Sequence, residues 1–245
     1  MSSVALIGDS WMREFRVETN PHFRHGLFKF TCDEDDRVQT STLHIYGYSS
    51  MKFTDWVGAR GDNFIHEWAN HVPSLSVLHL GAVDFASDDI PELQNLSTIK
   101  REYILYVRKH ISLWINKART HAVNKEEYDA KIKVHRWLLV EPPIWGQSFI
   151  PHTSVTPALY AQRRLRAEAS VRKNRTWNWE SLNLTVVRPY IIRFEFNQNH
   201  LSREAQSLYM ENLGRPMAAL LCRKCVMPIG TYISPHHKML RHHGL

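Results

Sequence analysis

Short apolar runs that end in turn residues alternate along the chain with longer segments whose apolar residues recur at helical spacing. The runs read as buried strands, because each is short and most are closed by glycine or proline, which interrupt a strand. They lie at residues 4–7, 42–46, 75–80, 134–140 and about 185–194. Glycine follows each of the first three, at Gly8, Gly47 and Gly81, and Pro142 and Pro143 stop the fourth.

Helical spacing is clearest between residues 99 and 118, where apolar positions recur three or four residues apart. The positions are Ile99, Tyr103, Val107, His110, Ile111, Trp114 and Ala118. Shorter helical patterns occupy 56–68, 159–170 and 205–221. This alternation predicts an α/β fold with a mostly parallel five-stranded sheet covered by helices on both faces. The polar segment 16–41 is predicted to form a long loop over one rim, with room for a short strand.

Composition narrows the class of protein. A chain of 245 residues that is 43% apolar suits one α/β domain with a short appendage. We expect the domain to span 1–221 and a basic Cys/His-rich tail to span 222–245.

No run of 18 apolar residues occurs, so no membrane span is expected. The opening apolar run is too short for a signal peptide, and three cysteines are too few for a disulfide framework. These features predict an intracellular protein, cytoplasmic or nuclear.

Two short motifs carry candidate chemistry. Gly8-Asp9-Ser10 ends the first predicted strand, so Ser10 lies in the turn before the next helix. Open α/β sheets bind ligands at this end of their strands. Far downstream, Asn197-Gln198-Asn199-His200 follows the last predicted strand and precedes a helix that Ser202 can cap. A serine nucleophile needs a base such as histidine, and the base needs an orienting acceptor.

The two motifs together resemble those of the SGNH (GDSL-type) hydrolases, over residues 4 to about 221. Within that family the chain looks most similar to the SGNH-like proteins of animal retroelements. The resemblance implies a three-layer α/β/α sandwich with a flavodoxin-like sheet, no cofactor, Ser10 as nucleophile and His200 as base. It also implies an oxyanion hole formed by Ser10, by Gly47 or Ser50, and by the segment from Gly81 to Val83.

The chain departs from the family pattern at two positions. Asn197 stands where the family has the aspartate that orients the histidine. An amide can hydrogen-bond the ring but cannot stabilise its protonated form as a carboxylate does, and Glu195 is an alternative orienter. Val83 stands where the family has an asparagine that donates to the oxyanion, and a lost donor costs on the order of 10²–10³ in rate. A weak esterase acting on small carboxylic esters is therefore the favoured function.

A basic stretch supports an alternative function, a catalytically impaired module that binds nucleic acid. The net charge of +7 permits such contacts. The stretch comprises Arg163, Arg164, Arg166, Arg172, Lys173 and Arg175, and two tryptophans follow at 177 and 179. Arginine and stacking tryptophan suit single-stranded nucleic acid. A solvated helix face whose aromatic residues return to the core is the simpler interpretation. A purely structural role is the third possibility.

The tail contains a possible zinc site. Cys222, Cys225, His237 and His242 are spaced nearly as in a C2H2 finger, and two cysteines with two histidines can hold zinc tetrahedrally. The alternative is a frayed, histidine-rich end after the last helix.

Overall fold

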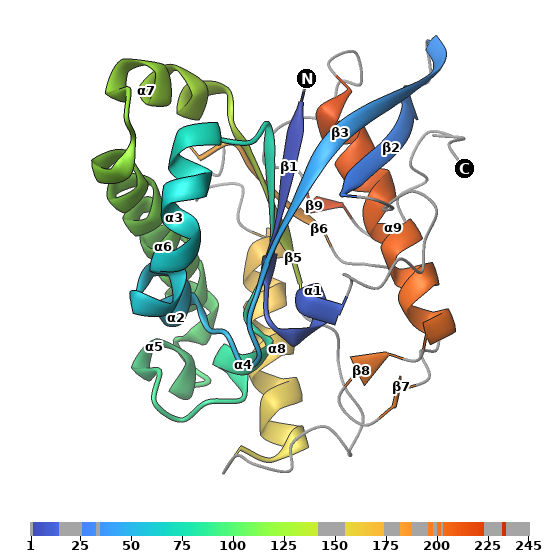
Figure 1. Ribbon diagram of the computed structural model, residues 1–245. Coiled ribbons are helices and arrows are strands. Elements are labelled where there is room, and N and C mark those ends of the chain that lie inside the picture. Colours follow the sequence, from blue (N-terminus) through green and yellow to red (C-terminus); the bar gives the residue numbers. More distant parts are fainter. Residues whose placement is uncertain are drawn as a thin grey trace.

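A computed structural model shows a seven-stranded sheet between layers of helices (Figure 1). The structure describes residues 2–14, 26–32, 35–141, 155–173, 182–187, 196–197, 200–201, 203–222 and 232–233. The sheet order is β2-β3-β1-β4-β5-β6-β9, and every pairing is parallel except that of β2 with β3. The predicted α/β class and its mostly parallel sheet are therefore confirmed.

The five predicted strands form the centre of this sheet. They are β1 (Ser3–Gly8), β3 (Asp35–Gly47), β4 (Leu75–His79), β5 (Arg136–Val140) and β6 (Leu184–Val187). Their spatial order places the first strand inside the sheet, with the second on one side and the third on the other. This is the flavodoxin-like order, and its switch point lies where the chain turns from one side of β1 to the other.

Four strands or strand parts depart from the prediction. The segment predicted as a loop contains β2 (Leu27–Cys32) and the first half of β3, which pair as an antiparallel hairpin. Val134 belongs to a helix, so β5 begins two residues later than predicted. Within the predicted tail, β9 (Tyr232–Ile233) adds to the sheet beside β6.

Helices occupy the connections between the strands. One group comprises α2 (Phe53–Val57), α3 (Ala59–His71), α4 (Ala82–Phe85), α5 (Pro91–Gln94), α6 (Ile99–His121) and α7 (Lys125–Val134). The others are α1 (Ser10–Glu14), α8 (Pro157–Lys173) and α9 (Arg203–Leu221). In Figure 1, α3 and α6 lie on one side of the sheet and α9 on the other. The seven apolar positions that predicted the longest helix are all buried in α6.

Tryptophan side chains join the helices of one layer to the sheet. Trp56 stacks on Trp114 with ring centroids 4.5 Å apart, which packs α2 against α6. Trp68 of α3 stacks on Trp137 of β5 at 5.7 Å, and its indole N–H donates to Ser76 Oγ at 3.0 Å. Burial of such large rings is the main stabilising contribution to a core. Trp56, Trp68 and Met51 are fully buried and belong to the core.

Candidate functional site

The carboxyl ends of three adjacent strands bring the first site segments together. Gly8 at the end of β1 is in register with Gly47 of β3 on one side and with His79 of β4 on the other. The Tyr48 N–H also donates to the Gly8 carbonyl at 3.3 Å. Ser10, the 47–50 turn and the segment after β4 consequently start from neighbouring points of one sheet edge. In Figure 1 this edge lies at the bottom, where α1, α4, β7 and β8 are also drawn.

Local contacts fix the turn that carries Ser10. A Cβ on Gly8 would lie 2.7 Å from the His79 carbonyl oxygen and 2.5 Å from Met12 Cγ, so a side chain there would push the segments apart. Asp9 Oδ1 accepts a hydrogen bond from the Trp11 N–H at 2.9 Å. This bond closes the turn and begins α1, whose first residue is Ser10. Ser10 is half-buried at this position.

The turn after β3 offers a backbone donor. Ser50 adopts a left-handed conformation with φ of 57°, which few residues other than glycine adopt. Its backbone N–H has no hydrogen-bond partner among the residues that the structure describes. Ser50 is exposed, whereas Gly47 is buried at the end of β3. Between the two residues considered for the second oxyanion donor, these observations favour Ser50.

Asp84 connects this turn to the segment after β4. Its Oδ1 accepts hydrogen bonds from the Phe53 N–H at 3.1 Å and from the Tyr106 hydroxyl at 2.7 Å. The second oxygen, Oδ2, is buried with no hydrogen-bond partner in the described chain. Burial raises the pKa of Asp84 to about 6, against the hydrogen bonds, which lower it. Asp84 therefore fixes the relative position of two predicted oxyanion segments.

Gly81 and Val83 lie on the segment that Asp84 fixes. Gly81 has φ of 112°, a left-handed conformation that suits glycine, and precedes the short helix α4. Val83 is half-buried, and its carbonyl accepts a hydrogen bond from Ser87 Oγ at 2.7 Å. A valine side chain has no donor, so this segment can contribute only backbone N–H groups to an oxyanion.

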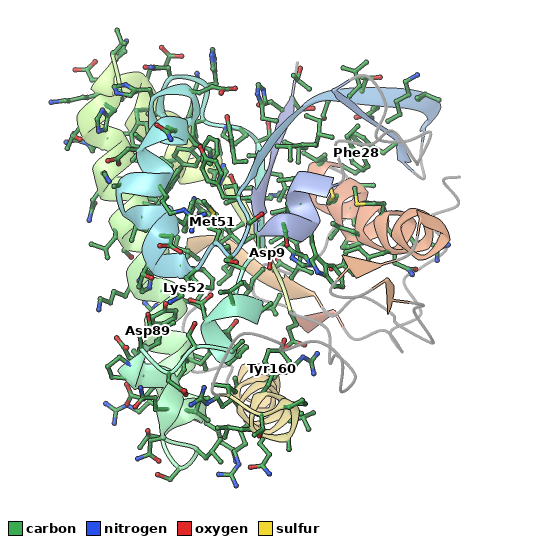
Figure 2. All side chains as sticks on the ribbon, turned by 60° about the horizontal axis from the view of Figure 1, so that its bottom comes forward. Asp9, Phe28, Met51, Lys52, Asp89 and Tyr160 are labelled. Carbon is green, nitrogen blue, oxygen red and sulfur yellow. The ribbon has the colours of Figure 1, made fainter. Side chains whose placement is uncertain are left out.

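A lysine lies beside the same segments. Lys52 Nζ donates to Asp89 Oδ2 at 2.7 Å, which joins the turn after β3 to the loop after α4. The lysine holds the pKa of Asp89 below its usual range through this hydrogen bond. Figure 2 looks more nearly onto the sheet edge and shows Lys52 and Asp89 to one side of Asp9, with Tyr160 on another.

The last motif forms a small hairpin before α9. Asn197 of β7 (Phe196–Asn197) pairs with His200 of β8 (His200–Leu201) in antiparallel register. The side chains of both residues lie outside the described part of the structure, as do those of Arg172 and Lys173. Residues Glu195, Ser202, Arg175, Cys225, His237 and His242 lie outside it entirely. The proposed contact between Ser10 and His200 thus stays a prediction.

A buried group that sequence reasoning missed lies beside the Ser10 turn. His79 Nε2 and the Tyr209 hydroxyl are 2.6 Å apart, and His79 Nδ1 is 3.9 Å from Asp9 Oδ1. Trp11 stacks on the His79 ring at 5.5 Å. Burial lowers the pKa of His79 to about 4, so the imidazole is neutral at neutral pH. His79 and Tyr209 are 130 residues apart, and the only signal in the sequence was a histidine inside a mostly apolar strand.

Two arginines of the basic stretch are buried, so the interpretation of this stretch as a solvated helix face is wrong for them. Arg163 and Arg164 are each only 3% exposed. The Arg163 guanidinium donates to the carbonyls of Phe85 and Ser87 and to the Asp88 carboxylate. Arg166 is exposed and donates to the Leu96 carbonyl at 2.7 Å.

One of the four residues predicted to bind zinc, Cys222, is not available as a ligand in this structure. Cys222 is disulfide-bonded, and zinc binds the cysteine thiolate rather than a disulfide sulfur. The described residues also contain no cluster of three or more His, Cys, Asp or Glu side chains that could hold a metal ion. Likewise, no helix in the described residues is both long and apolar enough to cross a membrane.

The strand order and the flanking helices match the α/β fold of solved SGNH hydrolase structures. A GDSL-like lipase from Bacteroides thetaiotaomicron superposes with a TM-score of 0.50 at 13% identity, over 88% of this chain and 87% of the lipase. A carbohydrate esterase of family 3 from Talaromyces cellulolyticus gives a TM-score of 0.44 at 16% identity, covering 90% of this chain and 98% of the esterase. An acetylxylan esterase from Geobacillus stearothermophilus gives 0.44 at 10% identity, covering 87% and 93%.

Comparisons of the sequence itself gave no match, either to a protein-family model or to a curated protein. At 13% identity, the similarity to the GDSL-like lipase shows the fold alone. The narrower resemblance to retroelement proteins stays a prediction.

Proposed function

We propose that the protein is a weak carboxylic-ester hydrolase in which Ser10 is the nucleophile and His200 the general base. The observation that carries the proposal is the position of Ser10. It begins α1 directly after β1, at the switch point of the sheet, where open α/β sheets bind their ligands. The Ser50 N–H and the Gly81–Val83 segment start from the strands on either side of it.

In the proposed reaction, Ser10 Oγ attacks the carbonyl carbon of the ester while His200 accepts the hydroxyl proton. The negative charge on the carbonyl oxygen is stabilised by the backbone N–H groups of Ser10 and Ser50. The intermediate then collapses, and the alcohol leaves with the proton held by His200. Water, deprotonated by His200, attacks the acyl-enzyme and releases the acid and free Ser10.

Two features account for the expected low rate. Asn197 can orient His200 only as a neutral hydrogen-bonding partner, so the imidazolium formed during the reaction is less stabilised. Val83 provides no side-chain donor, so the oxyanion has two donors instead of three. Small esters are the proposed substrates, and the chemistry requires neither metal nor cofactor.

Labelling with a fluorophosphonate tests the proposal, because this probe forms a covalent bond only with an activated serine. We expect slow labelling of the folded protein at Ser10, and none in Ser10→Ala or His200→Ala. Ser87→Ala is the matched control, since Ser87 follows the same sheet edge but its hydroxyl is bonded to the Val83 carbonyl. Absence of labelling in folded wild-type protein would contradict the proposal.

A further inference from the structure

A buried chain of contacts joins α9 to the nucleophile turn. Tyr209 lies in α9, two turns after the β7–β8 hairpin that carries Asn197 and His200. Its hydroxyl is 2.6 Å from His79 Nε2 at the end of β4. The His79 ring then stacks on Trp11, the residue after Ser10, and Trp11 meets Tyr209 edge-on at 5.6 Å. Three rings from three elements thus pack together directly beside Ser10.

The hydrogen bond has a defined direction. His79 is fully buried and neutral, so one of its ring nitrogens carries a proton and the other accepts. Asp9 Oδ1 lies 3.9 Å from Nδ1, and this negative charge favours the proton on that nitrogen. Nε2 is therefore the acceptor, and the Tyr209 hydroxyl donates to it. In a buried site, loss of this donor would leave the ring nitrogen without a partner, at a cost in free energy. This cost favours the one position of the tyrosine in which the hydrogen bond is made.

We propose that Tyr209 and His79 are positioning residues, which hold α9, and with it the hairpin of His200, in register with the Ser10 turn. This inference rests on the proposed function of Ser10 and His200. Neither positioning residue touches the substrate, because both are buried. They act through geometry: catalytic groups displaced by about 1 Å can lose roughly 100-fold in rate.

The test compares two variants that each remove one buried tyrosine hydroxyl. Tyr209→Phe removes the donor to His79, whereas Tyr128→Phe removes a hydroxyl that donates to the Ile115 carbonyl at 2.7 Å, away from the site. The fluorophosphonate labelling of Ser10 is measured as a maximal rate and a half-saturating probe concentration. We expect Tyr209→Phe to lower the maximal rate about 10-fold, part of the loss that misplacement causes, with little change in half-saturation. Tyr128→Phe should leave both unchanged.

A second pair of variants approaches the same hydrogen bond from His79. His79→Gln keeps an acceptor for the tyrosine hydroxyl, whereas His79→Leu removes it. Labelling of the glutamine variant should exceed that of the leucine variant. If Tyr209→Phe does not fold, this pair tests whether the hydrogen bond positions the site. Equal labelling rates in Tyr209→Phe and Tyr128→Phe, or in the two His79 variants, would overturn the proposal.

Hydrogen–deuterium exchange separates this inference from the proposed function. In Tyr209→Phe, peptides that cover residues 10–14 and 196–201 should exchange faster than in Tyr128→Phe. If wild-type protein is not labelled at all, the proposed function fails, and exchange alone decides whether Tyr209 couples the two segments. Unchanged exchange in both peptides would then overturn the coupling.

Discussion

At the scale of single residues, the proposed site has both reacting groups but not the two supporting groups that the resemblance implies. Ser10 and His200 are the residue types that acyl transfer requires. Asn197 and Val83 stand where the resemblance to the SGNH hydrolases implies an aspartate and an asparagine. The two missing groups affect different charges of the transition state, the imidazolium and the oxyanion, so supplying each should act separately.

Asn197→Asp should raise the hydrolysis of short-chain esters by at least about 10-fold, a small part of the roughly 10⁴ by which the opposite change lowers the rate of a serine protease. Val83→Asn should give a separate gain by returning a donor to the oxyanion, and the double variant should exceed either single one. Initial rates on a p-nitrophenyl ester measure this, with Ser10→Ala in each background as control. A folded double variant no faster than wild type would show that the site is not a weakened esterase site.

At the scale of elements, the helices and strands that the sequence predicted correctly are those with a strong apolar pattern. Helix α6 and strands β1 and β4 carry continuous or periodic apolar positions, and all were predicted. The first half of β3 is polar because it pairs only with β2, so no apolar pattern marked it. Arg163 and Arg164 looked like surface residues because charge alone gives no sign of the carbonyls that Arg163 meets. The contact of His79 with Tyr209 joins distant segments, which no local pattern indicates.

The buried Arg163 of α8 gives a prediction at this scale. Arg163 donates to the carbonyls of Phe85, the last residue of α4, and of Ser87, so Arg163→Met should leave buried acceptors unpaired and lower the free energy of unfolding by about 3 kcal/mol. Arg166→Met is the matched control, because that side chain is exposed and should cost below about 1 kcal/mol. Urea unfolding of the two variants measures the difference. Similar losses of unfolding free energy in the two variants would mean that the hydrogen bonds of Arg163 do not stabilise the end of α4.

At the scale of the whole molecule, buried ionisable groups make stability depend on pH. Burial lowers the pKa values of His79 and His135 to about 4, from about 6.5 in the unfolded chain. Each contributes stability that is fully present above pH 6.5 and is lost as the pH falls towards 4. Asp84 acts in the opposite direction: its raised pKa of about 6 means that its protonation stabilises the fold as the pH falls below that value.

His135→Gln isolates one of these contributions. His135 lies away from the site, and its Nδ1 donates to the Pro73 carbonyl, a bond for which glutamine keeps a donor. Between pH 6.5 and 4 the variant should lose less unfolding free energy than wild type, by up to about 3 kcal/mol. His79 and Asp84 are present in both proteins and cancel in the comparison. Parallel pH profiles for the two proteins would contradict the assigned burial of a neutral His135.

The most direct test of the central claim is to trap the acyl-enzyme. The protein is mixed with p-nitrophenyl acetate, quenched in acid within seconds, digested and analysed by peptide mass spectrometry. We predict one acetyl group on the peptide that contains Ser10, at the serine itself, and a strongly reduced amount in His200→Ala. Acetylation confined to lysines or to other serines, with Ser10 unmodified in folded protein, would contradict the assignment of Ser10 as the nucleophile.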